Sequence, residues 1–293
     1  MSCSPVWAFD HAKEDFHYSY PFQAGGQLEL SNQNGSVQIA GWDRNEIDVS
    51  GTKSASSSED LKLIKIIVEV HGSTASVSVD YPHDSGFGHS YGAQFVVRVP
   101  RKTVMGDAHT TNGSISAEDL EGGGRVSSTN GRLSLARDTG DYEAHTSNAT
   151  VEIEECSGNM KIETTNGAVR GRLKSGAMEA RSSNGSIDLT LMNPPDGSVV
   201  RASTTNGSVT LAMAAYHGNP VTVETTNGTI TLRMPADLNA NIDAHTSVGS
   251  VDYDLNVNGQ VRSSRNSVSG KLGSGGPPID LHTSVGSIHI EKY

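Results

Sequence analysis

Apolar and polar residues alternate along most of the chain, in short runs on both sides of a recurring asparagine. Around Asn148, the small or apolar partners are Ala144, Val151 and Ile153, and Thr146 stands two positions before the asparagine. The positions between them are mostly polar or charged. Alternation with a period of two predicts strands with one buried face. Each unit is therefore predicted to be two short, half-buried strands joined by a turn at the asparagine.

The asparagines recur at a spacing of 18 residues and then more loosely. The column consists of Asn112, Asn130, Asn148, Asn166, Asn184, Asn206 and Asn227. It continues in degenerate form at Val248, Asn266 and Val285. A fixed period near 20 residues is typical of stacked repeats. The coils should therefore have nearly equal perimeters.

Two architectures fit these units. An antiparallel β-meander would place Asn-Gly in type I′ hairpin turns, in which glycine is the harder residue to replace. At Asn148-Ala149 the glycine is lost and the asparagine is kept, which favours a ladder of stacked asparagine amides. Val248-Gly249 and Val285-Gly286 favour the meander instead. We predict an all-β, single-stranded β-solenoid with coils of 18–22 residues, wound as a right-handed β-helix, and keep the β-meander as the alternative.

The later units depart from the regular period. Inserts at 193–197 and 216–220 contain proline and glycine, which indicates surface loops. At 265–268 the glycine is missing and the aliphatic residue comes one position early, so an irregular coil is expected there.

The chain divides into three parts that form one structural unit. Residues 1–25 are expected to be a poorly structured or strapping tail, 26–106 an N-terminal β cap with the first coils, and 107–293 the regular repeats. An early copy of the motif occurs at Asn34-Gly35. A short helix is predicted to begin near Ser58, and the further predicted strands of the cap lie near residues 46–50, 66–70, 76–80 and 94–99.

Large residues gather before the regular repeats. Eleven of the fifteen aromatic residues precede residue 100. The open end of a solenoid exposes core and an unpaired edge, so a cap of larger residues is expected there. Capping is the favoured role of Trp42, Phe87, Tyr91 and Phe95.

Charge and composition narrow the functional classes. The net charge of −11 argues against nucleic-acid binding, which needs clustered Lys and Arg. No apolar run is long enough to span a membrane. No signal peptide is visible, and Cys3 could be the lipidated first residue of a mature lipoprotein. Cys156 is expected to be a packing residue, since two cysteines do not form a disulfide framework.

Several segments together resemble a known family. The stretch from Leu28 to Asp43, which contains Asn32-Gln33-Asn34-Gly35-Ser36-Val37, is followed by Val97-Arg98-Val99-Pro100 and then by serial Thr-Thr-Asn-Gly-Ser-Ile units. This combination resembles the bacterial DUF4097 family of adhesin-like proteins from about residue 26 onward. The resemblance implies a β-solenoid, an extracytoplasmic or envelope setting, and an adhesive or structural role. It supplies no catalytic residues.

Candidate chemistry is sparse. A column three positions before the asparagines contains His109, His145, His245 and His282, but this parity faces solvent and other coils separate the histidines. We therefore predict a solvated face without a metal site. The segment 81–92 is the weak binding candidate, through His83, Asp84, His89 and Tyr91, because loops often carry function. An ordinary hairpin loop is the favoured alternative.

The leading hypothesis is a protein of the cell envelope without enzymatic activity or cofactor, acting as an adhesin or a scaffold that offers a binding surface. Its partner is unidentified, with a glycan or an envelope protein as candidates. A carbohydrate-active β-helix enzyme is the alternative, although no paired carboxylates recur on one face. An accessory protein of envelope stress that binds a membrane partner is a further alternative.

Overall fold

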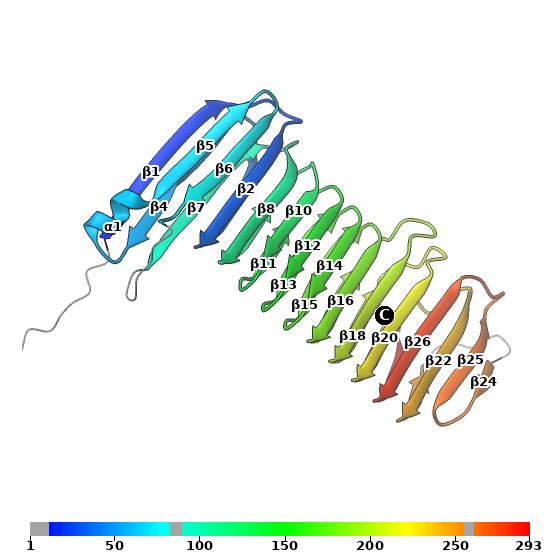
Figure 1. Cartoon of the computed structure of the whole chain (residues 1–293). Helices are drawn as coiled ribbons and strands as arrows, with labels where there is room; N and C mark the ends of the chain where they lie inside the picture. The colour runs from blue at the N-terminus through cyan, green and yellow to red at the C-terminus, as the bar shows by residue number, and fades with distance from the viewer. Residues whose placement is uncertain (1–11, 83–89, 255–260) are drawn as a thin grey trace, which may run out of the picture.

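The computed structural model describes residues 12–82, 90–254 and 261–293, and these residues form a rod built from two long sheets (Figure 1). A single short helix accompanies the strands in the described part of the chain. Sheet A has 13 strands and sheet B has 14, and hydrophobic side chains of both sheets fill the space between them. The prediction of an all-β solenoid is confirmed.

The strands of the two sheets follow one another along the rod. In spatial order, sheet A contains β1 (Ala12–Pro21), β4 (Glu46–Ala55), β7 (Tyr91–Pro100), β3 (Val37–Trp42), β9 (Ile115–Glu118), β11 (Leu133–Ala136), β13 (Val151–Ser157), β15 (Val169–Ser175), β17 (Ile187–Leu191), β19 (Val209–Met213), β21 (Ile230–Met234), β27 (Ile288–Lys292) and β23 (Val251–Tyr253). From the same end, sheet B contains β5 (Lys65–His71), β6 (Thr74–Asp80), β2 (Gln27–Asn34), β8 (Val104–Asn112), β10 (Gly124–Ser128), β12 (Tyr142–Thr146), β14 (Met160–Thr164), β16 (Met178–Asn184), β18 (Val200–Asn206), β20 (Val221–Asn227), β26 (Pro278–Val285), β22 (Ala240–Val248), β25 (Ser267–Leu272) and β24 (Val261–Ser263).

Each regular coil contributes one strand to each sheet, and the column asparagine lies at the turn between them. Strand β12 precedes Asn148 in sheet B, and β13 follows it in sheet A. Strands β12 and β14 pair in parallel, with Ala144 opposite Ile162. Parallel pairing of equivalent residues excludes the antiparallel meander for these coils. The right-handed winding stays a prediction.

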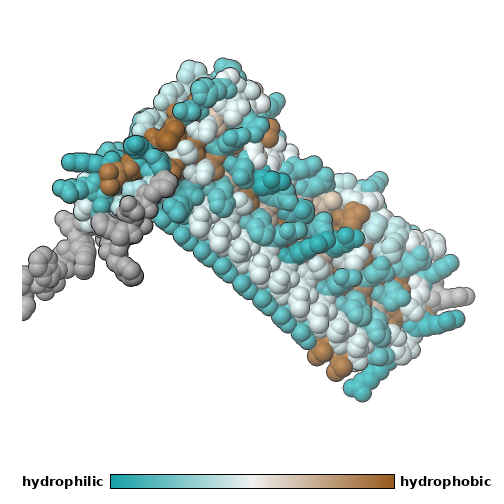
Figure 2. Space-filling view, in the orientation of Figure 1, coloured by the Kyte–Doolittle hydropathy of each residue, from teal (hydrophilic) through white to brown (hydrophobic). Residues whose placement is uncertain are grey.

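The column asparagines are joined by side-chain hydrogen bonds. Asn148 donates its Nδ2 hydrogen to Asn130 Oδ1 at 2.8 Å, and Asn166 donates to Asn148 Oδ1 at 2.9 Å. The chain of bonds starts at Asn34 and ends at Asn227. A regular row of hydrophilic side chains follows one long edge of the rod (Figure 2).

A second ladder runs inside this edge. The Thr or Ser two positions before each asparagine from Asn112 to Asn227 is buried. From Ser128 onward, its hydroxyl donates to a carbonyl of the preceding coil. For example, Thr204 Oγ1 bonds to Gly185 O at 2.9 Å and Thr225 Oγ1 to Gly207 O at 2.9 Å. These bonds satisfy carbonyls at a turn that would otherwise lack a partner.

Close stacking explains the glycine that follows most column asparagines. A Cβ atom at Gly185 would lie 1.9 Å from the carbonyl oxygen of Gly167, in the coil before it. Gly185 has no positive φ, so its role is to permit close approach and not to form a type I′ turn. The coils are therefore stacked so closely at this turn that glycine is the usual residue there, with Ala149 as an exception.

The N-terminal end agrees with the predicted cap in most elements. Helix α1 (Ser58–Leu63) begins after Ser57, whose side chain accepts a hydrogen bond from Asp60 N. Residues 12–21 of the expected tail form β1, which pairs antiparallel with β4 and so straps the edge of sheet A. Of the predicted capping aromatics, Phe95 is buried in the main core, and Phe87 lies outside the described residues.

The C-terminal coils do not follow sequence order. Strand β26 lies between β20 and β22 (Figure 1). In sheet A, β27 lies between β21 and β23. The last coil of the chain is thus inserted before the coil formed by β22 and β23. The irregular coil expected at 265–268 is wrong, because β24 and β25 form an antiparallel hairpin that pairs with β22.

Candidate functional site

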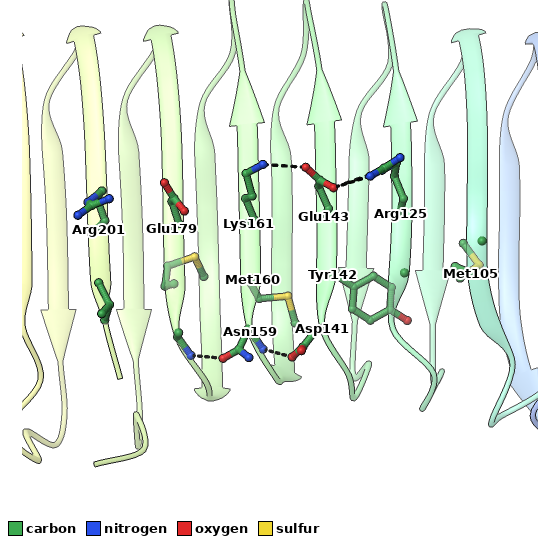
Figure 3. Close-up of a pocket in the computed structure, with 15 residues that line it drawn as sticks. Met105, Arg125, Asp141, Tyr142, Glu143, Asn159, Met160, Lys161, Glu179 and Arg201 are labelled. Carbon is green, nitrogen blue, oxygen red and sulfur yellow. Dashed lines mark hydrogen bonds and ion pairs between the residues drawn. The ribbon is translucent and has the colours of Figure 1, made fainter. Parts of the chain in front are cut away.

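A groove crosses the first residues of the sheet B strands between β8 and β18 (Figure 3). Its cavity has a volume of about 610 Å³, which lies in the range of ligand sites. Charged side chains form one wall and turn residues form the other. Because the groove runs across the strands, an occupant would contact successive coils.

The charged wall alternates in sign from coil to coil. Each member stands five positions before a column asparagine: Arg125, Glu143, Lys161, Glu179 and Arg201. The strand register places each one directly opposite the next. Since neighbouring strands are about 4.8 Å apart, charges of like sign are about 10 Å apart.

Ion pairs hold most of this wall in place. Lys161 Nζ donates to Glu143 Oε1 at 2.8 Å, and Arg125 Nη2 donates to Glu143 Oε2 at 2.9 Å. The hydrogen bond from Lys161, followed by that from Arg125, lowers the pKa of Glu143. Glu179 pairs at 2.6 Å with Arg181 of its own strand. Within the described residues, Arg201 has no ion pair and is the free cation of the wall.

The opposite wall consists of side chains that accept hydrogen bonds from backbone N–H groups of the next coil. Asp141 Oδ1 accepts from Asn159 N at 2.8 Å, and Asn159 Oδ1 accepts from Ala177 N at 3.1 Å (Figure 3). Between the walls lie nearly buried side chains, among them Tyr142 and Met160. The floor of the groove is therefore apolar, while both rims are polar.

Gly124 widens one end of the groove. Its φ is 138°, and a Cβ atom there would lie 1.9 Å from Met105 O. Both the backbone conformation and the close approach require glycine at this position. Gly124 lies opposite Tyr142 in the strand register, so the coil before that of Tyr142 has no side chain at this position.

A buried polar cluster lies at the corner of the same coils. Asp138 is fully buried, and its Oδ1 accepts a hydrogen bond from Leu120 N at 2.9 Å. In the described structure, Asp138 Oδ2 and the Tyr142 hydroxyl are buried without a hydrogen-bond partner. Burial raises the pKa of Asp138 to about 7. Burial also raises the pKa of Cys156 to about 11, so its thiol is not a nucleophile at neutral pH.

The binding candidates predicted from the sequence lie elsewhere. Tyr91 is in β7, where its hydroxyl donates to Asp60 Oδ1 at 3.4 Å and its ring packs against Tyr81. This contact belongs to a small cluster with α1. The remaining candidates lie outside the described residues: His83, Asp84 and His89. Cys3 also lies outside them.

The histidine column faces solvent, as predicted, with one correction. His245 and His282 are not separated by another coil, because β26 lies beside β22; their rings stack with centroids 5.7 Å apart. In residues 12–82, 90–254 and 261–293, no group of three His, Cys, Asp or Glu side chains is arranged to hold a metal ion.

The sequence contained a signal for the groove that the prediction did not use. The charges at five positions before the asparagines alternate over five successive coils. Once parallel stacking is accepted, this register places them in one row. The groove itself depends on Gly124 and on the turn residues, which no periodicity distinguishes.

These features define a class of protein: a parallel two-sheet β-solenoid with a polar-rimmed groove along its axis. The chain belongs to the Toastrack DUF4097 family, whose model matches residues 25–291. The family resemblance seen in the sequence is thereby confirmed.

Solved structures show the same distant likeness. A "putative adhesin" from Parabacteroides distasonis ATCC 8503 is 10% identical, with a TM-score of 0.47, and the match covers 97% of this chain and 98% of that one. A "putative adhesin" from Bacteroides fragilis NCTC 9343 is 13% identical, with a TM-score of 0.40 and coverage of 96% and 98%. A "putative lipid binding protein" from P. distasonis is 14% identical, with a TM-score of 0.37 and coverage of 95% and 96%.

The comparison with curated proteins gave no match. Among the described residues, no helix has the length and apolar character needed to cross a membrane.

Proposed function

We propose that this protein is a non-enzymatic adhesin or scaffold of the cell envelope, and that its groove holds an extended neutral glycan strand along the solenoid axis. The groove between β8 and β18 carries this proposal, because it is long, open and lined by the same positions of successive coils. The envelope setting is what membership of the family implies.

The chemistry of the groove favours a neutral sugar chain. Its charged wall alternates in sign, so it offers donors and acceptors for hydroxyl groups and lacks the cluster of cations that a polyanion needs. The net charge of −11 also opposes a polyanion. The apolar floor at Tyr142 and Met160 suits the apolar faces of sugar rings.

The same wall argues against glycoside hydrolysis. Glu143 and Glu179 are the carboxylates on this wall, and a hydrolase would need one of them as a general acid with a raised pKa. Lys161 and Arg125 lower the pKa of Glu143 instead. This shift of the pKa of Glu143 is opposite to that of a general acid and supports binding over hydrolysis.

A glycan array tests the proposal directly. The wild-type protein is expected to retain a defined set of neutral oligosaccharides, and Arg201→Ala to weaken their binding about tenfold by removing the free cation of the wall. Arg170→Ala, an exposed arginine of β15 on the other sheet, is the matched control and should bind like the wild type. Absence of any glycan binding, or equal loss in both variants, would contradict the groove assignment.

Product analysis tests the non-enzymatic part. The oligosaccharide that binds best is incubated with the protein and the mixture is examined by mass spectrometry. We expect the oligosaccharide to be recovered intact. Any turnover that disappears in Glu143→Gln would overturn the assignment and show a hydrolase.

A further inference from the structure

The two ends of the rod differ in how their sheet edges are protected. At the C-terminal end, the edge strands β23 and β24 have three residues each. At the N-terminal end, the edge strands β1 and β5 have ten and seven residues (Figure 1). Short edge strands limit pairing with other chains, whereas long ones leave a row of backbone groups open. The N-terminal end is therefore the end that can pair.

Of the two long edge strands, β5 is the less protected against pairing with another chain. Strand β1 carries charged residues at Lys13, Glu14 and Asp15 and ends at Pro21, which are common protections of an edge. Strand β5 instead has the apolar run from Ile66 to Val68, and Ile67 is exposed. Its inward side chains are only half-buried.

The backbone of β5 decides which residues can pair at the open edge. A two-residue turn at Gly72-Ser73 joins β5 to β6, with His71 opposite Thr74. The residues that flank such a turn are hydrogen-bonded to each other, so the backbone of His71 faces β6. By alternation, the N–H and C=O groups of Ile66, Val68 and Val70 face the open edge.

We infer that two copies of this chain associate end to end by antiparallel pairing of their β5 strands. One register satisfies the backbone and the charges together: Ile66 opposite Val68, Lys65 opposite Glu69, and Ile67 opposite its own copy on the two-fold axis. The register shifted by two residues in one direction places Glu69 opposite Ile67, and a further shift places Glu69 opposite Glu69. The strand is self-complementary in one arrangement, which joins the two copies of sheet B into a continuous sheet.

The contacts at this edge fit the pairing. Lys65 and Glu69 are both exposed, and Glu69 has His71 Nε2 at 3.4 Å as its ion partner within the chain. Pairing gives each Glu69 a lysine as well and covers the exposed Ile67.

A cysteine cross-link tests the register. In a Cys3→Ser background, Ile67→Cys places two thiols on the two-fold axis at a non-hydrogen-bonded pair, with Cα atoms about 4.5 Å apart, which lies within disulfide range. Mild oxidation should give a covalent dimer. Lys65→Cys is the matched control, because its two copies would lie about 13 Å apart along the strands. Equal cross-linking of both variants, or none, would overturn the register.

Exchange of the charges at Lys65 and Glu69, followed by analytical ultracentrifugation, tests whether the partner of β5 is a second copy of the chain. The wild type should show a concentration-dependent dimer, and Lys65→Glu should weaken it about tenfold or more by placing acidic residues opposite each other. The double variant Lys65→Glu/Glu69→Lys should restore it, since the exchanged pairs again have opposite charge. A wild type that stays monomeric, or a double variant that is not restored, would overturn the inference, and the latter would indicate a different partner for β5. Circular dichroism confirms that each variant is folded.

Discussion

Asp138 lies at the corner of its coil. The equivalent corner residues are Leu120 in the coil before it and Cys156 in the coil after it. In each of these coils the preceding residue has a positive φ, at Asp119, Arg137 and Glu155, and the next side chain turns into the core. A carboxyl group therefore stands in an apolar column. Its burial is costly unless it is neutral, which is why its pKa is raised to about 7.

Replacing Asp138 by Asn should remove a pH dependence of stability. In the folded chain Asp138 stays protonated up to about pH 7, whereas in the unfolded chain it ionises near its ordinary value of 3.8. The wild type should therefore lose stability as the pH rises from about 4 to 7, by up to about 4 kcal/mol for a shift of this size. Thermal unfolding at pH 5 and pH 8 measures the loss.

The control for this prediction is Asp188→Asn on the exposed face of β17. This variant should keep the pH dependence of the wild type. A wild type and an Asp138→Asn variant with the same change in melting temperature between pH 5 and pH 8 would show that Asp138 does not titrate as argued.

Two threonines of the inner ladder form a matched pair. Thr204 donates to Gly185 O, but the hydroxyl of Thr110 is buried without a hydrogen-bond partner in the described structure. The reason is Asn32, whose Nδ2 occupies the equivalent carbonyl, Gly35 O, at 3.0 Å. The same residue type therefore contributes differently in two coils.

Valine substitutions should separate the two roles. Thr204→Val should destabilise the fold by about 1–2 kcal/mol, because it leaves a carbonyl without a partner. Thr110→Val should be neutral or stabilising, because no bond is lost. Equal melting temperatures for the two variants would contradict the assignment of the inner ladder.

At the scale of the element, the asparagine ladder joins neighbouring coils on the outside of the edge whose inner side carries the Thr and Ser ladder. An interior asparagine donates one amide bond and accepts another. Asn227 only donates, to Asn206 at 3.0 Å, because the next coil along the rod has Val285 at this position. The ladder therefore has an end where the C-terminal coil is inserted.

Alanine substitutions should reflect position in the ladder. Asn148→Ala removes two amide bonds and should cost about 1–2 kcal/mol, whereas Asn227→Ala removes one and should cost about half as much. Chemical denaturation of both variants measures the difference. If Asn227→Ala is the more costly, the ladder is not what holds these turns together.

At the scale of the whole molecule, the order of the C-terminal coils makes the end of the chain an internal part of the rod. Strand β26 pairs on one side with β20 and on the other with β22. Strand β27 does the same in sheet A. The last residues therefore hold the preceding coil to the solenoid.

Deleting residues 278–293 should consequently open the middle of the stack instead of trimming its end. Amides of β22 and β25 are expected to lose protection from hydrogen exchange, while those of β12 and β14 keep it. Deletion of a terminal coil from a stack in sequence order would leave all preceding strands protected. Full protection of β22 after the deletion would contradict the observed order.

Much of the fold could be predicted because equivalent positions of successive repeats have the same environment. Ala144 and Ile162 lie opposite each other since each sits four positions before its asparagine, and local alternation is enough to assign both to the core. The charged wall follows the same rule. Its five members could have been placed in one row from their shared register, although the cavity beside them could not.

The features that could not be predicted are contacts between residues that do not occupy equivalent positions of consecutive repeats in the sequence. Strand β1 pairs with β4, and His282 stacks on His245, through contacts that the 18-residue spacing does not encode. In the sequence, Asp138 resembles an ordinary polar turn residue. Its burial follows from the backbone geometry at the corner, where Arg137 has a positive φ.

The sequence by itself determined the two-strand unit and the faces that each residue presents, and it favoured the parallel stack, because these depend on alternation within a unit and on equal coil lengths. The tertiary structure alone decided the order of the last coils, the groove across sheet B and the open edge at β5. Those features depend on which coil packs against which and on how much room a turn leaves, and such long-range contacts are fixed only when the whole chain has folded.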